Sequence, residues 1–302
     1  MTPNTFPAVD TYYHRHAGVG MLRLTLRALQ QAWPSLATRA ATRLFLTPLP
    51  PKWAQRGKPW GAEWAAERWP FEEASITVYR HRPCVMKATA VLVHGWGGHA
   101  GQMLPLAALL ASRGWNPVLL EMPGHGRSQG WQSNLPQFTR AIDYVSARLV
   151  QDGHSLGALV GHSLGGTAAA FVAARSTSFS RLALIAPAAS PPAYTRLFAQ
   201  VFGLKEEVRA AMQKRIEARE GILMPQFEPR AVGSRIAAPT LVVHDRSDPV
   251  NRFADGQAFA SAVSNAQLFA TEGLGHRKIL KEPAVLDTIA AFLGQPGELQ
   301  AR

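Results

Sequence analysis

The sequence predicts an α/β fold in which a mostly parallel central sheet is covered by helices on both faces. Strand-like and helix-like segments alternate from about residue 75 onwards, which is the order that a parallel sheet with crossover helices requires. Several of the strand-like runs are apolar throughout, as expected of parallel strands that are buried on both faces. Motifs rich in glycine, histidine and aspartate follow these runs, and the carboxyl ends of the strands are where such sheets hold their sites.

Composition limits the class of protein. The chain has 302 residues, of which 47% are hydrophobic, and this is enough for one large domain with an extension. Cys84 is the single cysteine, which excludes an internal disulfide and a thiolate metal cluster. The first ten residues, MTPNTFPAVD, lack the basic and apolar regions of a signal peptide. No uncharged apolar run approaches the roughly 18 residues of a membrane span, so we expect a cytoplasmic protein.

The net charge of +12 is concentrated near the N-terminus, where no acidic residue lies between Asp10 and Glu63. Eight basic residues lie in that stretch: Arg15, Arg23, Arg27, Arg39, Arg43, Lys52, Arg56 and Lys58. We therefore expect a basic extension over residues 1–70 and the α/β domain over residues 71–302. No nucleic-acid-binding motif accompanies the charge, so we expect no nucleic acid as a partner.

Within this extension, Met21–Phe45 is predicted to be helical, with Pro34 expected to kink or split it. Apolar residues recur three and four positions apart, which marks one helix face; they are Leu22, Leu26, Leu29, Trp33, Leu36, Ala40 and Leu44. This stripe could dock on the chain's own domain. Alternatively, a basic amphipathic helix with tryptophan could lie peripherally on an anionic membrane.

The elements of the α/β domain are expected as follows. Strands are predicted over Ser75–Arg82, Ala88–Val93, Pro117–Glu121, Leu156–Val160, Arg181–Ile185, Pro239–His244 and Ala266–Ala270. Helices are predicted over Gln102–Ser112, Pro136–Val150, Thr167–Arg175, Arg252–Val263 and Pro283–Leu293. A helical lid insertion is expected at about residues 187–235, with one clear helix at Lys205–Glu220. Its Phe198, Phe202, Met212, Met224 and Phe227 could line an acyl pocket or form the core of the lid.

The pentapeptide Gly-His-Ser-Leu-Gly occurs twice in residues 153–165, and both copies match the G-x-S-x-G pattern of a nucleophilic serine on a strand-to-helix turn. Ser163 follows a short apolar run and precedes an alanine-rich helix, as this turn requires. Gly161, Gly165 and Gly166 keep the turn free of side chains. Ser155 follows polar turn-forming residues instead. We therefore expect Ser163 to be the nucleophile and Ser155 to begin the strand that leads to it.

The stretch from about Ser75 to Leu293 resembles the α/β-hydrolase fold superfamily, as a serine esterase or lipase-like member. The resemblance rests on HGWGG (94–98), MPGHGRS (122–128), VGHSLGG (160–166), HDRSDPV (244–250) and GLGHRKIL (273–280), in the family's order. Glu121 is a departure, because the family often has aspartate before its Pro-Gly-His-Gly turn. We expect this change to alter a local hydrogen bond only.

The resemblance implies a catalytic triad in the chain order serine, acid, histidine. His276, in a glycine-flanked loop after the last strand, is the expected base, while His94 and His125 are expected to bond to the backbone of tight turns. Two acids follow the strand PTLVVH, and the resemblance favours Asp248 as the acid that orients His276. Asp245 is then a turn-former at the strand end.

The N–H of Leu164, after the nucleophile, is expected to form one half of an oxyanion hole. The resemblance assigns the other half to the N–H of Trp96.

The predicted function is a serine hydrolase that cleaves a small-molecule carboxylic ester or thioester through an acyl-enzyme intermediate. The same triad could transfer the acyl group to an alcohol, and a chain with this fold could instead be a non-catalytic binding or membrane-surface protein. No histidine pair has the spacing of a metal site, and no G-x-G-x-x-G motif opens a helix. We therefore expect neither a metal nor a cofactor.

Overall fold

A computed structural model describes residues 17–49, 52, 60–82 and 88–294 of the chain. Arg15, Arg56, Lys58, Cys84 and the first ten residues, on which parts of the sequence analysis depend, lie outside the described residues. The chain divides into two compact units. The helical unit consists of Met1–Thr47 and Ser190–Glu228, and the sheet unit consists of Pro48–Ala189 and Pro229–Arg302. The sequence-based division places residues 1–70 in an extension and the insertion in the α/β domain. In the structure the insertion groups instead with residues 1–47.

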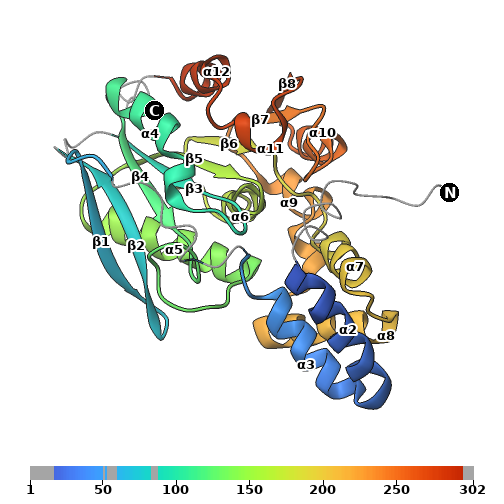
Figure 1. Ribbon diagram of the computed structural model, residues 1–302. Helices are drawn as coiled ribbons and strands as arrows, with labels where there is room; N and C mark the ends of the chain where they lie inside the picture. The colour runs from blue at the N-terminus through green and yellow to red at the C-terminus, as the bar shows by residue number, and fades with distance from the viewer. Residues whose placement is uncertain (1–16, 50–51, 53–59, 83–87, 295–302) are drawn as a thin grey trace. The chain divides into compact units, whose positions relative to one another are not determined.

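Among its described residues, the sheet unit contains one sheet of eight strands in the order β1-β2-β4-β3-β5-β6-β7-β8 (Figure 1). The strands are β1 (Trp64–Phe71), β2 (Ala74–His81), β3 (Thr89–Val93), β4 (Asn116–Glu121), β5 (Leu156–His162), β6 (Arg181–Ile185), β7 (Thr240–Asp245) and β8 (Ala266–Thr271). The pairs β1–β2 and β2–β4 are antiparallel, and the other five pairs are parallel. The predicted α/β class with a mostly parallel sheet is therefore confirmed.

Helices join and cover the strands of this sheet. They are α4 (Leu104–Ser112), α5 (Leu135–Gln151), α6 (Leu164–Ala173), α9 (Pro229–Val232), α10 (Phe253–Ala262), α11 (Gly275–Lys278) and α12 (Pro283–Leu293), with short 3-10 turns η2 (Ala100–Gln102) and η4 (Gly233–Arg235). Side chains of α4 and α12 form one core with alternate residues of the central strands, such as Leu92 and Val160. Helix α6 packs on β5, β6 and α5. Every residue of β3, β4, β5 and β7 is buried, as their apolar sequences predict.

Strand β1 was not predicted from the sequence. It carries Pro70, which cannot donate a ladder hydrogen bond and is tolerated at the edge of a sheet. The structure places β1 at one end of the strand order, where it pairs with β2 alone.

The helical unit combines α2 (Ala17–Ala32) and α3 (Pro34–Phe45) with the insertion helices α7 (Pro191–Phe202) and α8 (Glu206–Glu220) and the turn η3 (Met224–Phe227). Figure 1 shows the N-terminal helices in blue beside the insertion helices in yellow. The insertion's Phe202, Met212 and Met224 are buried in one core with Leu26 of α2 and Ala41 of α3. These aromatic and methionine side chains therefore form the core of the insertion.

The N-terminal helices dock on the insertion, and the expected apolar stripe is only partly buried. Leu26 is buried, whereas Leu22, Trp33 and Leu36 of the same stripe are exposed. For Leu36, which follows the break between the helices, the physical reason is Pro34, which opens α3 directly after α2 ends. Because the chain changes direction there, the face that is buried on α2 does not continue in phase along α3.

Candidate active site

Ser163 lies on a sharp turn between β5 and α6 and has a φ of 54°, which is rare for a residue with a side chain. Its N–H donates to the carbonyl of Ile185 at 2.9 Å. A Cβ at Gly161 would lie 2.4 Å from the carbonyl oxygen of Gly165, and one at Gly165 would lie 2.4 Å from that of His94. Only glycine fits these two positions, so the turn is packed tightly enough to hold Ser163 in its strained conformation. Ser155, by contrast, precedes the opposite end of β5 and is exposed.

Asp248 and His276 are in direct contact. The distance from Oδ2 of Asp248 to Nδ1 of His276 is 2.7 Å. Oδ1 of Asp248 accepts the N–H groups of Val250 at 2.7 Å and Asn251 at 3.0 Å, which fixes the carboxylate. With its Nδ1–H donated to Asp248, the imidazole presents Nε2 as a proton acceptor.

Asn251 connects this pair to Ser163 and was not found by the sequence analysis. Its Nδ2 donates to the carbonyl of Ala186 at 2.7 Å and lies 3.4 Å from Oγ of Ser163. Because a carbonyl can only accept, the short contact with Ala186 fixes which end of the amide is NH₂. Ser163 then accepts from Asn251 and keeps its own hydroxyl proton for another acceptor. Asparagine is common in loops, so its sequence position gave no signal of this contact.

Two buried histidines, His162 and His244, contact the backbone of the loops that carry His276 and Asn251. Nε2 of His162 is 3.0 Å from the carbonyl oxygen of His276, and the two rings lie 4.6 Å apart. Nε2 of His244 is 3.0 Å from the carbonyl oxygen of Asn251 and 3.6 Å from Oδ2 of Asp248. Burial lowers the pKa of both imidazoles, so both are neutral near pH 7 and donate to these carbonyls.

Asp245 has a different environment from Asp248, although it is the last residue of β7 and Asp248 lies only three residues further along the chain. Its Oδ1 accepts from the N–H of Ser247 at 3.1 Å and from the hydroxyl at 2.6 Å. Its Oδ2 accepts from the hydroxyl of Thr271 at 2.7 Å and the N–H of Leu274 at 3.0 Å. Burial acts to raise the pKa of Asp245, but these hydrogen bonds hold it well below its ordinary value. Asp245 therefore fastens the turn after β7 to the loop that leads to His276.

The loop at residues 94–98 lies against Ser163, because a Cβ at Gly95 would be 2.7 Å from Cβ of Ser163. The next amide in the chain is that of Trp96. On the other side of Ser163, Leu164 is the first residue of α6, so its N–H has no acceptor within the helix. Both amides predicted for the oxyanion hole thus belong to segments that are adjacent to Ser163.

His94 and His125 bond to backbone groups, as predicted. Nε2 of His125 accepts the N–H of Gly97 at 3.0 Å, and Nε2 of His94 accepts the N–H of Met122 at 3.1 Å. Burial lowers the pKa of His125 to about 4, which keeps its Nε2 available as an acceptor. The two histidines link the loop at residues 94–98 to the turn at residues 122–128.

Glu121 contacts the chain just after the first of these segments, at Ala100, and the second segment at Gly126. Its carboxylate accepts the N–H of Ala100 at 2.9 Å and contacts the hydroxyl of Tyr79 at 3.4 Å. Gly126 has a φ of 45°, which favours glycine, and a Cβ there would lie 2.2 Å from the carboxyl carbon of Glu121. Burial raises the pKa of Glu121 to about 7.

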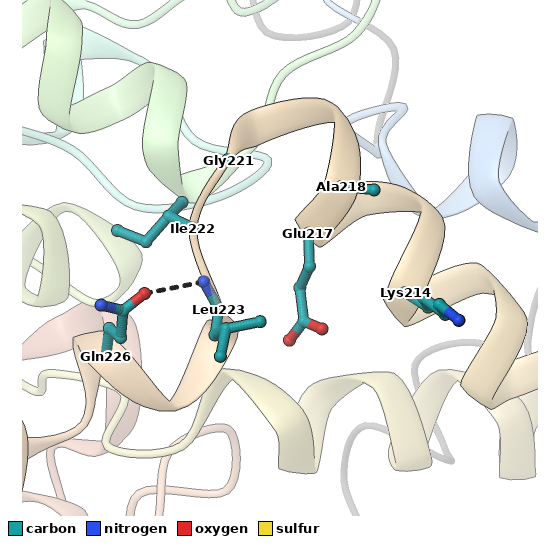
Figure 2. Close-up of a pocket in the computed structure, with 7 residues that line it drawn as sticks. All are labelled: Lys214, Glu217, Ala218, Gly221, Ile222, Leu223 and Gln226. Carbon is teal, nitrogen blue, oxygen red and sulfur yellow. Dashed lines mark hydrogen bonds between the residues drawn. The ribbon is translucent and has the colours of Figure 1, made fainter.

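A pocket lies in the helical unit, at the turn after α8 (Figure 2). It is lined by Lys214, Glu217, Ala218, Gly221, Ile222, Leu223 and Gln226. None of the residues predicted to act in catalysis belongs to this lining. Among the described residues, no group of three histidine, cysteine or acidic side chains is arranged to hold a metal ion. Likewise, no described helix has the length and hydropathy needed to cross a bilayer.

Two family models match the chain, and their ranges overlap at residues 223–227. Residues 85–227 match a family described as "Serine aminopeptidase, S33", and residues 223–302 match one described as "TAP-like protein". Both matches are consistent with the mostly parallel sheet and with the strained turn at Ser163 described above. The chain belongs to the α/β-hydrolase superfamily. The resemblance stated from the sequence motifs is therefore confirmed.

Among solved structures, this α/β hydrolase is similar to Est1E from Butyrivibrio proteoclasticus, with a TM-score of 0.65 and 20% identity over 78% of this chain and all (100%) of that chain. It is also similar to a bacterial membrane phospholipase A, with a TM-score of 0.59 and 19% identity over 94% of this chain and 98% of that one. These similarities show the shared fold.

A curated relative from Mycoplasma genitalium, named "Putative esterase/lipase 2", is 24% identical over 96 residues. The match covers 32% of this chain and 36% of the relative. The α/β hydrolase thus spans about a third of the length of that curated relative.

Proposed function

We propose that this α/β hydrolase is a serine hydrolase that cleaves a carboxylic ester or thioester through an acyl-enzyme intermediate. The observation that carries the proposal is the 2.7 Å contact between Asp248 and His276, on loops whose neighbour Asn251 reaches Oγ of Ser163. A serine hydroxyl becomes a useful nucleophile only when an oriented base accepts its proton. Ser163, His276 and Asp248 are proposed for these three roles.

In the proposed acylation step, Oγ of Ser163 forms a bond to the carbonyl carbon of the substrate, and its proton moves to Nε2 of His276. The resulting imidazolium keeps its Nδ1–H on Asp248, which stabilises the new positive charge. The oxyanion is proposed to accept hydrogen bonds from the N–H groups of Leu164 and Trp96. His276 then returns its proton to the leaving alcohol or thiol as the bond to the carbonyl carbon breaks.

In the proposed second half, a water molecule takes the place of the leaving group. His276 accepts its proton while the water oxygen attacks the acyl carbon, and the proton then passes to Oγ of Ser163 as the acid leaves. An alcohol in place of water would give acyl transfer by the same steps. Acyltransfer is therefore the alternative outcome of the same site.

Phospholipid is a second candidate substrate class. The match with the membrane phospholipase A covers 94% of this chain, whereas the match with Est1E covers 78%. The match with the phospholipase therefore includes a larger share of this chain. This similarity favours lipid esters, beside small soluble esters, as substrates to be tested.

The proposal is tested by labelling with a fluorophosphonate probe and by turnover of p-nitrophenyl esters of increasing chain length. Ser163→Ala is expected to abolish both labelling and turnover. Ser155→Ala is the matched control, since it alters the same pentapeptide at the other end of β5, and it is expected to retain both. Equal loss in the two variants, with folding intact by circular dichroism, would contradict the proposed nucleophile.

Further substrates in the same assay separate the alternatives. A short-chain phosphatidylcholine tests lipid esters, and an aminoacyl p-nitroanilide tests the amide cleavage that the name of the matched family suggests. Added alcohol tests acyl transfer through the ratio of ester to acid among the products. A folded wild-type protein that neither binds the probe nor turns over any of these substrates would indicate a non-catalytic protein.

A further inference from the structure

Helices α2 and α3 expose a cluster of large apolar side chains. Across the described part of the chain, nine large hydrophobic side chains are exposed, and five of them lie between residues 21 and 36. These are Met21, Leu22, Leu24, Trp33 and Leu36. Met21 is 74% exposed, Leu24 68% and Trp33 63%. Soluble proteins usually carry such side chains singly, so a cluster of this kind indicates a binding surface.

The most exposed side chains of α2 do not belong to the face of the helix that forms the core of the helical unit. The core of the helical unit already contains the face of α2 with Val19 and Leu26, and Met21 and Leu24 lie on the opposite face of the helix. Gln30 fixes that face, because Nε2 donates to the carbonyl of Gly203 at 2.9 Å and Oε1 accepts the N–H of Lys205 at 2.8 Å. Helix α2 is thus held on one side by the insertion helices, and its other side is left for a partner.

The outward side of α2 forms a second apolar stripe. Met21, Leu24, Ala28 and Ala32 are all exposed and follow one another at intervals of three or four residues, so they share one face of the helix. Trp33, at the turn into α3, adds an exposed aromatic ring at the end of α2. Such rings favour the boundary between an apolar phase and water.

Basic residues flank this stripe, and no acidic residue lies on either helix. Arg27 on α2 and Arg39 on α3 are exposed. A partner for this surface must therefore offer an apolar phase and negative charge together. A second copy of the same helices would bring arginines against arginines, which is unfavourable. The boundary of an anionic bilayer offers acyl chains to the apolar side chains and headgroup phosphates to the arginines.

We propose that the α2–α3 surface, defined as Met21, Leu22, Leu24, Trp33 and Leu36 with Arg27 and Arg39, binds the boundary of an anionic lipid bilayer. The apolar side chains enter the acyl-chain region, and the two arginines bind headgroup phosphates. This inference concerns binding alone and does not depend on the proposed catalytic function.

The test is flotation of the full-length protein with vesicles of phosphatidylcholine, with and without phosphatidylglycerol. It uses the Ser163→Ala background, so that lipid cleavage cannot alter the vesicles. Binding is expected with the anionic vesicles and is expected to be much weaker with phosphatidylcholine alone. The electrostatic part should weaken between about 0.1 M and about 1 M salt, because the screening length falls from about 10 Å to about 3 Å.

Two sets of substitutions assign the binding to this surface. Met21→Ser, Leu24→Ser and Trp33→Ser together are expected to abolish binding, since burying each large side chain contributes on the order of tenfold or more in affinity. Their matched control is Trp131→Ser, a tryptophan of the sheet unit that is 67% exposed. It is expected to bind as the parent protein does.

Arg27→Gln with Arg39→Gln is expected to weaken binding about 25-fold, since each basic residue near an anionic surface contributes about fivefold. The control with the same change in net charge is Arg68→Gln with Arg82→Gln, two exposed residues of the sheet unit. It is expected to have a much smaller effect. Thermal unfolding by circular dichroism identifies any variant that fails to fold.

Three results would overturn the proposal. The first is absence of binding to anionic vesicles by the folded parent protein. The second is unchanged binding by the folded apolar triple variant. The third is a dimer of the parent protein, measured by sedimentation, that the apolar substitutions disrupt while vesicle binding is absent. That result would assign the surface to contacts between copies of the chain.

Discussion

Asp248→Asn changes a single functional group at the carboxylate that contacts His276, and the surrounding hydrogen bonds decide how the new amide is oriented. Oδ1 of Asp248 accepts the N–H groups of Val250 and Asn251, so the amide oxygen must stay on that side. The amide NH₂ then takes the place of Oδ2, which is 2.7 Å from Nδ1 of His276. Nδ1 would face a donor and would have to become an acceptor.

The imidazole of His276 would then carry its proton on Nε2 and could not accept the proton of Ser163. In a well-studied catalytic triad the same substitution lowers kcat by about 10⁴-fold, which corresponds to about 5.5 kcal/mol in the activation barrier. We expect a loss of the same order in kcat/KM for a p-nitrophenyl ester. We expect only a small change in thermal unfolding, because the shape of the side chain and its contacts with the loop backbone are retained.

Asp245→Asn is the matched control, because Asp245 ends β7 and precedes Asp248 by only three residues. Each oxygen of Asp245 accepts one backbone N–H and one hydroxyl, so either orientation of an amide places NH₂ against a backbone donor. Hydrogen bonds to a charged group contribute about 1.5–3 kcal/mol each. We expect the free energy of unfolding to fall by about 2–4 kcal/mol, with kcat/KM reduced by no more than about tenfold at temperatures where the variant is folded.

The two measurements together can refute this reasoning. If Asp245→Asn loses more activity than Asp248→Asn at a temperature where circular dichroism shows both to be folded, the orienting acid has been assigned to the wrong residue. Near-normal activity in Asp248→Asn would show that the orientation of His276 by a carboxylate does not limit the reaction.

Three further predictions follow from contacts in the sheet unit. Burial raises the pKa of Glu121 from 4.5 to about 7, so the folded state binds more protons than the unfolded state between these values. The free energy of unfolding should therefore fall by up to about 3 kcal/mol as pH rises through that window, and urea titrations should show Glu121→Gln to lack this dependence. Asn251→Ala removes the donor to Ser163 and should lower kcat roughly tenfold with little change in KM in steady-state kinetics. Gly161→Ala should lower the unfolding free energy by more than about 2 kcal/mol, because its Cβ meets backbone at 2.4 Å, whereas Gly20→Ala in α2, where the Cβ meets nothing within 4 Å, should raise the thermal midpoint.

The central part of the fold could be predicted closely from the sequence because its signals are local. The predicted Arg181–Ile185 strand and Pro283–Leu293 helix have the observed bounds of β6 and α12, since each is an apolar segment between residues that end regular structure. Strand β1 gave no such signal. It contains Pro70 and charged residues, and it becomes a strand by pairing along β2, a long-range interaction that no local pattern reports.

The N-terminal helices show a second limit of prediction from local sequence. Their helical character is a local property and was predicted, but which face is buried depends on the partner. The insertion helices that bury Leu26 follow it by more than 160 residues in the chain, and the break at Pro34 changes the phase between α2 and α3. A stripe read continuously through that break therefore mixes buried and exposed positions.

The candidate site divides in the same way. Ser163 could be separated from Ser155 because an apolar strand and a small-residue helix flank only one of them, and both features are local. Asp248 and Asp245 could not be separated by local pattern, since the two aspartates are only three residues apart in the sequence, and the choice rested on a resemblance. In the structure they differ in what reaches their oxygens: Asp245 receives only backbone and hydroxyl donors, whereas one oxygen of Asp248 is left for an imidazole. Asn251 extends the argument, because its side chain contacts Ser163 only after β5, β6 and β7 lie side by side. A contact between residues 88 positions apart depends on how the strands pair, so the role of Asn251 could not be predicted from its local sequence.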